Sequence, residues 1–239
     1  MEPYTAAIIT IHQRIGAALA AIAADLNSSV SVITWVIAGP LLAFAVFTPM
    51  AGKLGDLYGH RRMYLIGFAG AAVFSLLTSF ATSAFMLIAV RVIAQGFAAS
   101  TGPSALAIMM SVFPEDRRTR VAGTWSAVLA AAPAIGVAVG GPLIEATSWR
   151  VLFVIQGSGM AVAVALAWFV LPATDRREDH TFDVVGSLLL AIGIGSLLVA
   201  INRGVPLGWD HPWVIAGLFT SPVFVLAFLR YEQRIEHLL

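Results

Sequence analysis

The stretch GKLGDLYGHRR, residues 52–62, gathers four cationic or imidazole side chains and an aspartate between two long apolar runs. Residues 32–51 form the run before it, and residues 63–82 form the run after it. Each run has roughly the ~20 residues that a helix needs to cross the hydrocarbon core of a bilayer. The stretch therefore predicts a short polar connection between two membrane-spanning helices.

Composition indicates the same class of protein along the whole chain. Of the 239 residues, 59% are hydrophobic and 11% are charged, and the mean hydropathy is +0.88. That hydropathy is far above the range of a water-soluble domain. The formal net charge of +1 gives no overall attraction to nucleic acid. The sequence has no cysteine, which excludes disulfides and thiolate metal sites.

Cutting the chain at its charged clusters leaves eight apolar runs of about spanning length. The runs are continuous rather than alternating, which favours helices over the strands of a membrane barrel. We therefore predict an all-α polytopic membrane protein. The predicted spans are residues 5–24, 32–51, 63–82, 84–113, 121–144, 151–171, 184–201 and 213–229.

The distribution of lysine and arginine among the connections predicts the orientation. With eight spans and a cytoplasmic N-terminus, ten of these residues lie inside and two lie outside. This split predicts a multi-pass protein of the cell membrane with both termini in the cytoplasm. The ten are Lys53, Arg61, Arg62, Arg117, Arg118, Arg120, Arg176, Arg177, Arg230 and Arg234, and the two are Arg150 and Arg203.

The opening stretch also carries a specific spacing, G-x-L-x-D-x-x-G-x-R-R from residue 52 to residue 62. It resembles the G-x-L-x-D-R-x-G-R-R/K signature between the second and third helices of the major facilitator superfamily. The sequence departs from that signature at Leu57 and His60. An ordinary positive-inside loop is the alternative, and it is favoured for Arg62 taken alone. The resemblance implies a gating role at the cytoplasmic face for Gly52, Asp56, Gly59, Arg61 and Arg62.

The fourth predicted span contains RVIAQGFAA, residues 91–99, which is similar to the R-x-x-x-Q-G pattern of the same superfamily. An arginine inside a span costs about 2.5–3.5 kcal/mol on insertion scales, so Arg91 should face a polar cavity or a partner. Gln95 shares its helical face at i+4. The resemblance implies a transport pathway formed by Arg91, Gln95 and Gly96. A purely structural arginine bonded to backbone carbonyls is the alternative.

The fifth predicted span contains AAPAIGVAVGGPL, residues 131–143, which is similar to the A-P-x-x-G-P-x-x-G-G element of superfamily antiporters. Its small residues recur every four positions, which lets another helix approach closely. Val137 stands where the element has proline. The resemblance implies a gating helix with Pro133, Gly136, Gly140 and Gly141, and plain helix packing is the alternative.

The tail from residue 181 onward resembles the seventh and eighth helices of the fourteen-helix drug:proton antiporter branch. The resemblance covers nearly the whole chain, from about Ala18. It implies a six-helix bundle of the major facilitator fold at 1–171, a cytoplasmic linker at 172–183, and two additional transmembrane helices with a cytoplasmic tail at 184–239. The implied function is secondary active transport, multidrug-type efflux by proton antiport, in an N-terminal half or fragment.

The resemblance implies as partners the lipid bilayer, a small amphipathic substrate, protons, and a C-terminal half or second chain. Aligning ALAAIAADL, residues 18–26, with the branch places Ile11 where the branch carries an aspartate. The predicted spans then hold only His12, Arg14 and Arg91 as ionisable groups. A non-transporting truncated protein, or an interaction subunit that pairs with another helical bundle, is the alternative function.

Sequence motifs of other protein classes are absent. The chain has no P-loop, no G-x-S-x-G and no H-E-x-x-H, and its five histidines lack the spacing of metal ligands. We therefore expect no enzymatic activity, no catalytic residues, no cofactor and no metal site.

Overall fold

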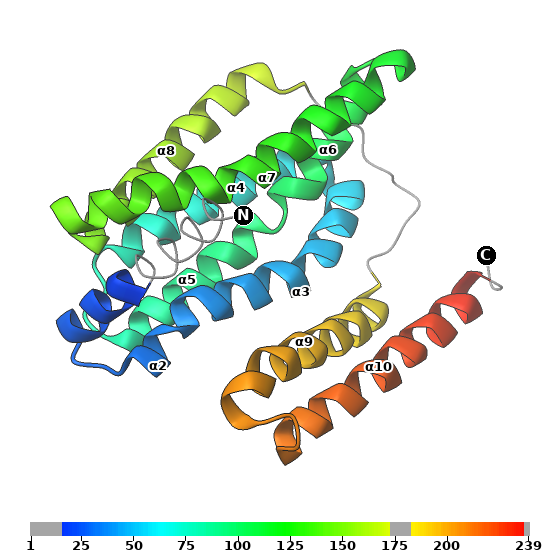
Figure 1. The fold of residues 1–239 in the computed structure, drawn as a ribbon. Helices are drawn as coiled ribbons and strands as arrows, with labels where there is room; N and C mark the ends of the chain where they lie inside the picture. Colours follow the sequence, from blue (N-terminus) through cyan, green and yellow to red (C-terminus); the bar gives the residue numbers. More distant parts are fainter. Residues whose placement is uncertain (1–15, 173–182, 237–239) are drawn as a thin grey trace, which may run out of the picture.

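The computed structural model describes residues 16–172 and 183–236, and every regular element within them is a helix (Figure 1). A short apolar helix covers Gly16–Asp25. The elements that follow are α2 (Val30–Ile33), α3 (Trp35–Tyr58), α4 (His60–Thr78), α5 (Ala84–Ala98), α6 (Thr101–Val112), α7 (Glu115–Ala146), α8 (Trp149–Val170), α9 (Val184–Leu207) and α10 (Pro212–Glu236).

Six helical segments of the described chain are long and apolar enough to cross a membrane. This confirms the prediction of an all-α polytopic membrane protein. The third predicted span corresponds to α4, which has 19 residues but begins with His60, Arg61 and Arg62, and these lower its hydropathy. The first predicted span lies partly outside the described residues. The six segments are Val30–Tyr58, Ala84–Val112, Glu115–Ile144, Trp149–Val170, Val184–Leu207 and Pro212–Gln233.

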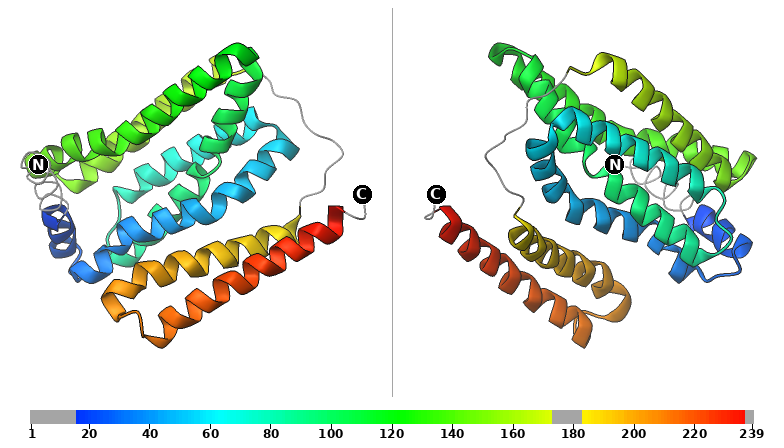
Figure 2. Two further views of the ribbon diagram at one scale, coloured as in Figure 1. Left: turned by 45° about the vertical axis from the view of Figure 1, so that its right-hand side comes forward. Right: turned by 180° about the vertical axis from the view of Figure 1, so that it is seen from behind.

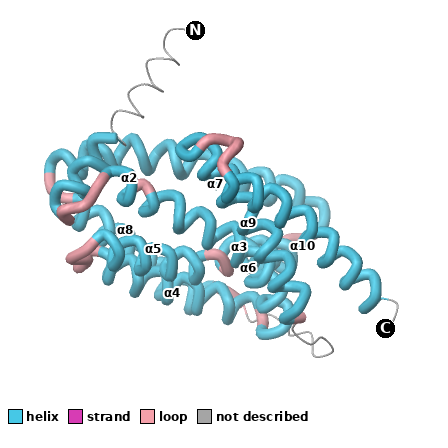
Figure 3. Tube along the Cα trace, turned by 90° about the horizontal axis from the view of Figure 1, so that it is seen from below, coloured by secondary structure: helices cyan, strands magenta, loops and turns pink. Residues whose placement is uncertain are grey.

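Successive spans run in opposite directions, so the connections gather at two ends of the molecule (Figures 1 and 2). One end carries the α3–α4 connection at Gly59, and we call it the Gly59 end. The opposite end carries Asp25 and the start of α8, and we call it the Asp25 end. Short loops join the helices within the described ranges (Figure 3).

Close helix contacts hold α4 against its two main neighbours, α5 and α8. Gly67 of α4 lies against the α5–α6 junction, where an added Cβ would overlap the Ser100 side chain. Gly157 of α8 lies against α4, where an added Cβ would overlap Leu76 and the Ala72 carbonyl. Small residues at both crossings let the backbones approach closely, as is usual for helices in membranes.

The fourth predicted span is interrupted. The sequence predicts one helix over 84–113, but the helix breaks into α5 and α6 at Ala99 and Ser100. Pro103 lies one turn after the break and has no N–H to donate to the Ala99 carbonyl. The Ser100 hydroxyl donates to the carbonyl oxygens of Phe97 and Met63, both at 3.0 Å, which ties the break to α4.

The predicted polar connection 52–62 is largely helical rather than a loop. Helix α3 continues to Tyr58, and α4 begins at His60, so only Gly59 lies outside a helix. Its φ of 90° and ψ of 128° belong to a region that other residues rarely adopt. The turn is therefore sharper than the predicted polar connection of eleven residues, because one residue supplies the whole reversal.

Helices α9 and α10 form an antiparallel pair that packs along α3 (Figure 2). Gly193 and Gly217 allow the two helices to approach closely, because an added Cβ at either position would crowd the partner helix. Two charged contacts join α9 to α3. At the Gly59 end, Lys53 Nζ lies 3.8 Å from Asp183 Oδ2. Toward the Asp25 end, the Arg203 guanidinium lies 4.4 Å from the centre of the Trp35 ring.

Candidate functional site

A partly open cavity of about 520 Å³ lies between the helices, in the half nearer the Asp25 end. Its volume falls in the range of about 300–1,000 Å³ that is usual for small-molecule sites. Its wall is mostly apolar, and five helices contribute to it. The lining residues are Ala18, Leu19, Ile22, Val36, Ile37, Pro40, Leu41, Arg91, Gln95, Gly136, Gly140, Gly141, Ile144, Leu152, Phe153 and Gln156.

Arg91 extends from α5 to the wall formed by α8. Its Nη1 donates to Oε1 of Gln156 at 3.2 Å, and its guanidinium lies 4.9 Å from the centre of the Phe153 ring. Its Nε is buried and has no hydrogen-bond partner among the described residues. No described carboxylate lies within ion-pair distance of Arg91. Among the described residues, Arg91 therefore makes one hydrogen bond to a neutral amide and one cation–π contact with an aromatic ring.

The other predicted pathway and gating-helix residues divide between the cavity and its surroundings. Gln95, Gly136, Gly140 and Gly141 line the cavity together with Arg91. Gly96 packs instead against α3, where an added Cβ would lie 3.6 Å from the Phe47 ring. Pro133 is exposed on α7 and does not line the cavity.

Two further cavity residues, Phe153 and Gln156, were not among the candidates from the sequence. Both lie on α8 one helical turn apart, and both contact Arg91. Gln156 is the one amide side chain in the mostly apolar run 151–171. That isolated amide was the available signal, because a polar side chain inside a span usually faces the interior of a bundle.

The predicted gating residues of the opening stretch lie at the Gly59 end, away from the cavity. Gly52 faces Pro103 of α6, and Asp56 Oδ1 lies 3.1 Å from Nε2 of His60. Arg61 Nη2 donates to the Trp168 carbonyl oxygen at 2.6 Å, which joins α4 to α8.

The remaining residues of this group differ in their surroundings. Arg62 is exposed, and Gly59 is buried at the turn. Gly55 admits the His60 ring, because an added Cβ there would overlap it. The described part of this stretch thus joins α3, α4, α6 and α8.

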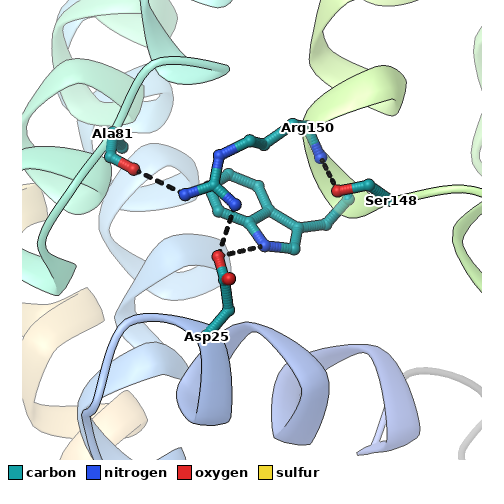
Figure 4. A network of polar contacts seen from close by, with 5 residues as sticks. Asp25, Ala81, Ser148 and Arg150 are labelled. Carbon is teal, nitrogen blue, oxygen red and sulfur yellow. Dashed lines mark hydrogen bonds and ion pairs between the residues drawn. The ribbon is translucent and has the colours of Figure 1, made fainter.

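A polar network at the Asp25 end was also missed at the level of sequence (Figure 4). Arg150 donates through Nη1 to Asp25 Oδ2 and through Nη2 to the Ala81 carbonyl oxygen at 3.0 Å. The Trp149 indole N–H donates to Asp25 Oδ2 at 3.1 Å, and the Arg150 guanidinium lies 4.3 Å from the Trp149 ring centre. The hydrogen bond from Arg150 holds the pKa of the Asp25 carboxyl below its ordinary value. The network joins three connections of the bundle.

A signal for this network was present in the sequence. Asp25 follows the first predicted span and Arg150 precedes the sixth, so both were predicted on the same side of the membrane. Opposite charges on one side can pair, although the sequence alone does not show which ones do. Within the described residues, no group of three or more histidine, cysteine or acidic residues could hold a metal ion.

These observations define a polytopic helical membrane protein with a cavity between its helices, whose described wall holds one arginine. Comparison with known proteins identifies the family. The sequence model of the Major Facilitator Superfamily matches residues 5–231, so the chain belongs to that superfamily.

Three relatives illustrate the match. The chain is 33% identical over 221 residues to the probable actinorhodin transporter of Streptomyces coelicolor. The aligned region covers 90% of this chain and 38% of that relative. It is 35% identical over 215 residues to the tetracenomycin C resistance and export protein of Streptomyces glaucescens, and the aligned region covers 90% of this chain and 39% of that relative. It is 32% identical over 204 residues to the multidrug resistance protein Stp of Mycobacterium tuberculosis, covering 84% and 38%. The chain thus spans about two fifths of the length of these relatives.

Proposed function

We propose that this chain is the N-terminal part of a secondary active transporter that exports small amphipathic compounds in exchange for protons. The proposal includes membership of the fourteen-helix drug:proton antiporter branch. It takes residues 1–171 as the six-helix bundle, 172–183 as a cytoplasmic linker and 184–239 as two additional helices with a tail. The names of the relatives, which include export and resistance proteins, support the export of small molecules.

The cavity is the observation that carries the proposal. A mostly apolar space of about 520 Å³ suits the body of an amphipathic compound, and Arg91, Gln95 and Gln156 offer it a few polar contacts. The glycines of α7 form part of the same wall, so a movement of α7 would change the shape of the space. This arrangement supports a transport pathway at Arg91 and Gln95, with Gly96 supporting it from the α3 side.

Transport of this kind needs a second bundle. Secondary transporters rock two bundles against each other around a site near the middle of the membrane. Much of α7 is exposed, including Val128, Leu129, Ile135 and Val139. We assign this face to a C-terminal half or a second chain, with the gating residues Asp56, Arg61 and Arg62 at the cytoplasmic edge of the contact.

Complementation tests the proposal. Residues 1–239 would be expressed in an efflux-deficient bacterium, alone and together with a separately encoded C-terminal half from a relative. Dye efflux is expected only with the added half, and a protonophore should abolish it. Efflux by the isolated chain would contradict the half-transporter assignment, unless crosslinking shows a homodimer. Efflux that survives the protonophore would contradict proton exchange.

Two variants sharpen this experiment. Arg91→Ala should abolish efflux at normal expression, because the cavity would lose its charged group; retained efflux would assign Arg91 a structural role. Asp56→Asn should weaken efflux, because a charge-assisted hydrogen bond of about 1.5–3 kcal/mol would be lost at the cytoplasmic edge. Asp116→Asn, at an exposed site on α7, serves as the control.

The proposed location is the cell membrane, with both termini in the cytoplasm. The chain has no cysteine, so single cysteines can report sidedness without background. A cysteine at Leu239 should react with an impermeant reagent only after the cells are opened. Labelling of intact cells would contradict the proposed orientation.

A further inference from the structure

The charge of the cavity points to a class of substrate. Arg91 is the only charged residue among the described residues that line it, and the other polar side chains are the two neutral amides of Gln95 and Gln156. The apolar residues around them include Phe153, Ile22 and Pro40. The described wall of the cavity therefore combines one fixed positive charge with a large apolar surface.

Within the described part of the chain, most hydrogen-bond donors of Arg91 have no partner. A guanidinium has five N–H donors, and within the described residues Arg91 uses one, to Gln156. Its buried Nε has no partner there. A buried charge without a counter-charge is unfavourable, and a carboxylate suits a guanidinium because it can accept two parallel hydrogen bonds. Among the described residues, the site thus lacks the acidic group that an anionic ligand would bring.

Phe153 compensates part of the positive charge of Arg91. Its ring lies 4.9 Å from the guanidinium, and such cation–π contacts compensate a buried cation only in part. A cationic compound in the same space would meet the positive charge of Arg91 with no described carboxylate on the wall to offset the repulsion. An anion meets attraction instead, and the low dielectric of the site strengthens both effects.

From this arrangement we infer that the cavity selects amphipathic organic anions, with the acid group on Arg91 and the apolar body against Ile22, Pro40 and Phe153. The inference rests on the proposed function in taking this cavity as the substrate site. It narrows the substrate from amphipathic compounds in general to those that carry a carboxylate or another acidic group.

Three probes with one aromatic skeleton test the inference. They are 2-naphthoate, 2-naphthamide and 2-naphthylmethylammonium, which differ in the charge of one substituent. Binding to the 239-residue chain in nanodiscs of zwitterionic lipid would be measured at pH 7.5 by equilibrium dialysis, with empty nanodiscs subtracted. The anion should bind about tenfold or more tightly than the cation, as expected for a charge-assisted hydrogen bond to a buried group. Equal or tighter binding of the cation would overturn the inference, and this comparison needs no variant.

Variants then assign the preference to Arg91. Arg91→Gln should remove the preference for the anion over the cation, and it should weaken the binding of the anion more than that of the neutral amide. Arg203→Gln is the matched control, because Arg203 stacks on Trp35 and does not line the cavity. A preference that survives Arg91→Gln, or that disappears equally in Arg203→Gln, would overturn the assignment.

The acid group could belong to a free solute or to an anionic lipid, and the nanodisc composition separates these sources. If an anionic lipid occupies the site, adding phosphatidylglycerol should weaken the binding of naphthoate to the unmodified chain. It should not weaken the binding of naphthoate to the Arg91→Gln variant. No such difference indicates a free solute. Efflux without any charge preference would contradict this inference alone. A charge preference without efflux in the complementation experiment would contradict the proposed function alone.

Discussion

Arg150 at the start of α8 donates a hydrogen bond to the carboxylate of Asp25, which lies 125 residues earlier in the chain. The same carboxylate oxygen accepts the indole N–H of Trp149, and Arg150 also reaches the Ala81 carbonyl oxygen. Trp149 belongs to a buried apolar cluster that also contains Ile22 and Phe153, and these two residues line the cavity. The network is therefore connected through Trp149 to the apolar core that forms part of the cavity wall.

The network of Asp25 and Arg150 should make the thermal stability of the protein depend on pH in the acidic range. Arg150 lowers the pKa of Asp25, so the stabilisation is complete above the ordinary aspartate pKa of about 3.9 and is lost as the pH falls through the lowered value. Thermal unfolding in detergent between about pH 3 and pH 7 measures this. Asp25→Asn should melt at a lower temperature at neutral pH and lose part of the acidic slope.

The size of that effect should be modest, because the side chains of Arg150 and Asp25 are 36% and 44% exposed. Asp116→Asn is the control, since its ion pair with Arg117 is more exposed, and it should leave the melting curve unchanged. An Asp25→Asn variant with an unaltered acidic slope would show that the pair does not titrate as described.

The turn between α3 and α4 should tolerate only glycine at position 59. Gly59 has φ 90°, and a side chain there would be strained by about 1–3 kcal/mol. Gly59→Ala should therefore lower the melting temperature. Gly102→Ala is the matched control, because Gly102 lies inside α6 with nothing within 4 Å of an added Cβ. Alanine favours a helix over glycine by up to about 1 kcal/mol, so Gly102→Ala should be neutral or stabilising. Equal destabilisation by both variants would refute the prediction.

Asp183 should hold α9 in place through interactions that include a helix cap and an ion pair with α3. Its Oδ1 accepts the Gly186 N–H at 2.8 Å as the helix cap, and its Oδ2 lies 3.8 Å from Lys53. Asp183→Asn keeps a capping acceptor and loses the ion pair, whereas Asp183→Ala loses both. Loss of a cap costs about 0.5–2 kcal/mol, and exposed ion pairs contribute about 0–1 kcal/mol. Alanine should therefore speed amide hydrogen exchange in the first turn of α9 more than asparagine does; the reverse order would count against the capping role.

The cavity should be filled by a large side chain at Gly136. This glycine lines the cavity, and an added Cβ there would meet no atom within 4 Å, so a side chain can begin at this position without a clash. Gly136→Leu should weaken the binding of all three naphthalene probes while expression is maintained. Gly123→Leu, on the same helix but away from the cavity and equally free of neighbours, should leave binding unchanged. Equal losses in both variants would place the binding space elsewhere.

Much of the fold could be predicted from local sequence. The lengths of the apolar runs indicate membrane-spanning helices, because each run must satisfy its own backbone within the bilayer. The motif around Asp56 and the one at Arg91 indicated the superfamily before any comparison. The position of the break at Ser100 could not be predicted from local sequence. Pro103 permits a break, but its position depends on the hydrogen bond from Ser100 to the Met63 carbonyl oxygen of α4.

The sequence by itself determined that the chain is a helical, multi-pass membrane protein of this superfamily, and that Arg91 needs a polar environment inside a span. Only the tertiary structure decided that this environment is Gln156 and Phe153, that Gly96 faces Phe47, and that Asp25 pairs with Arg150. The reason is physical. Hydropathy and turn residues act over a few neighbouring positions, whereas contacts between distant helices depend on how each helix is rotated and how closely its small residues let it approach.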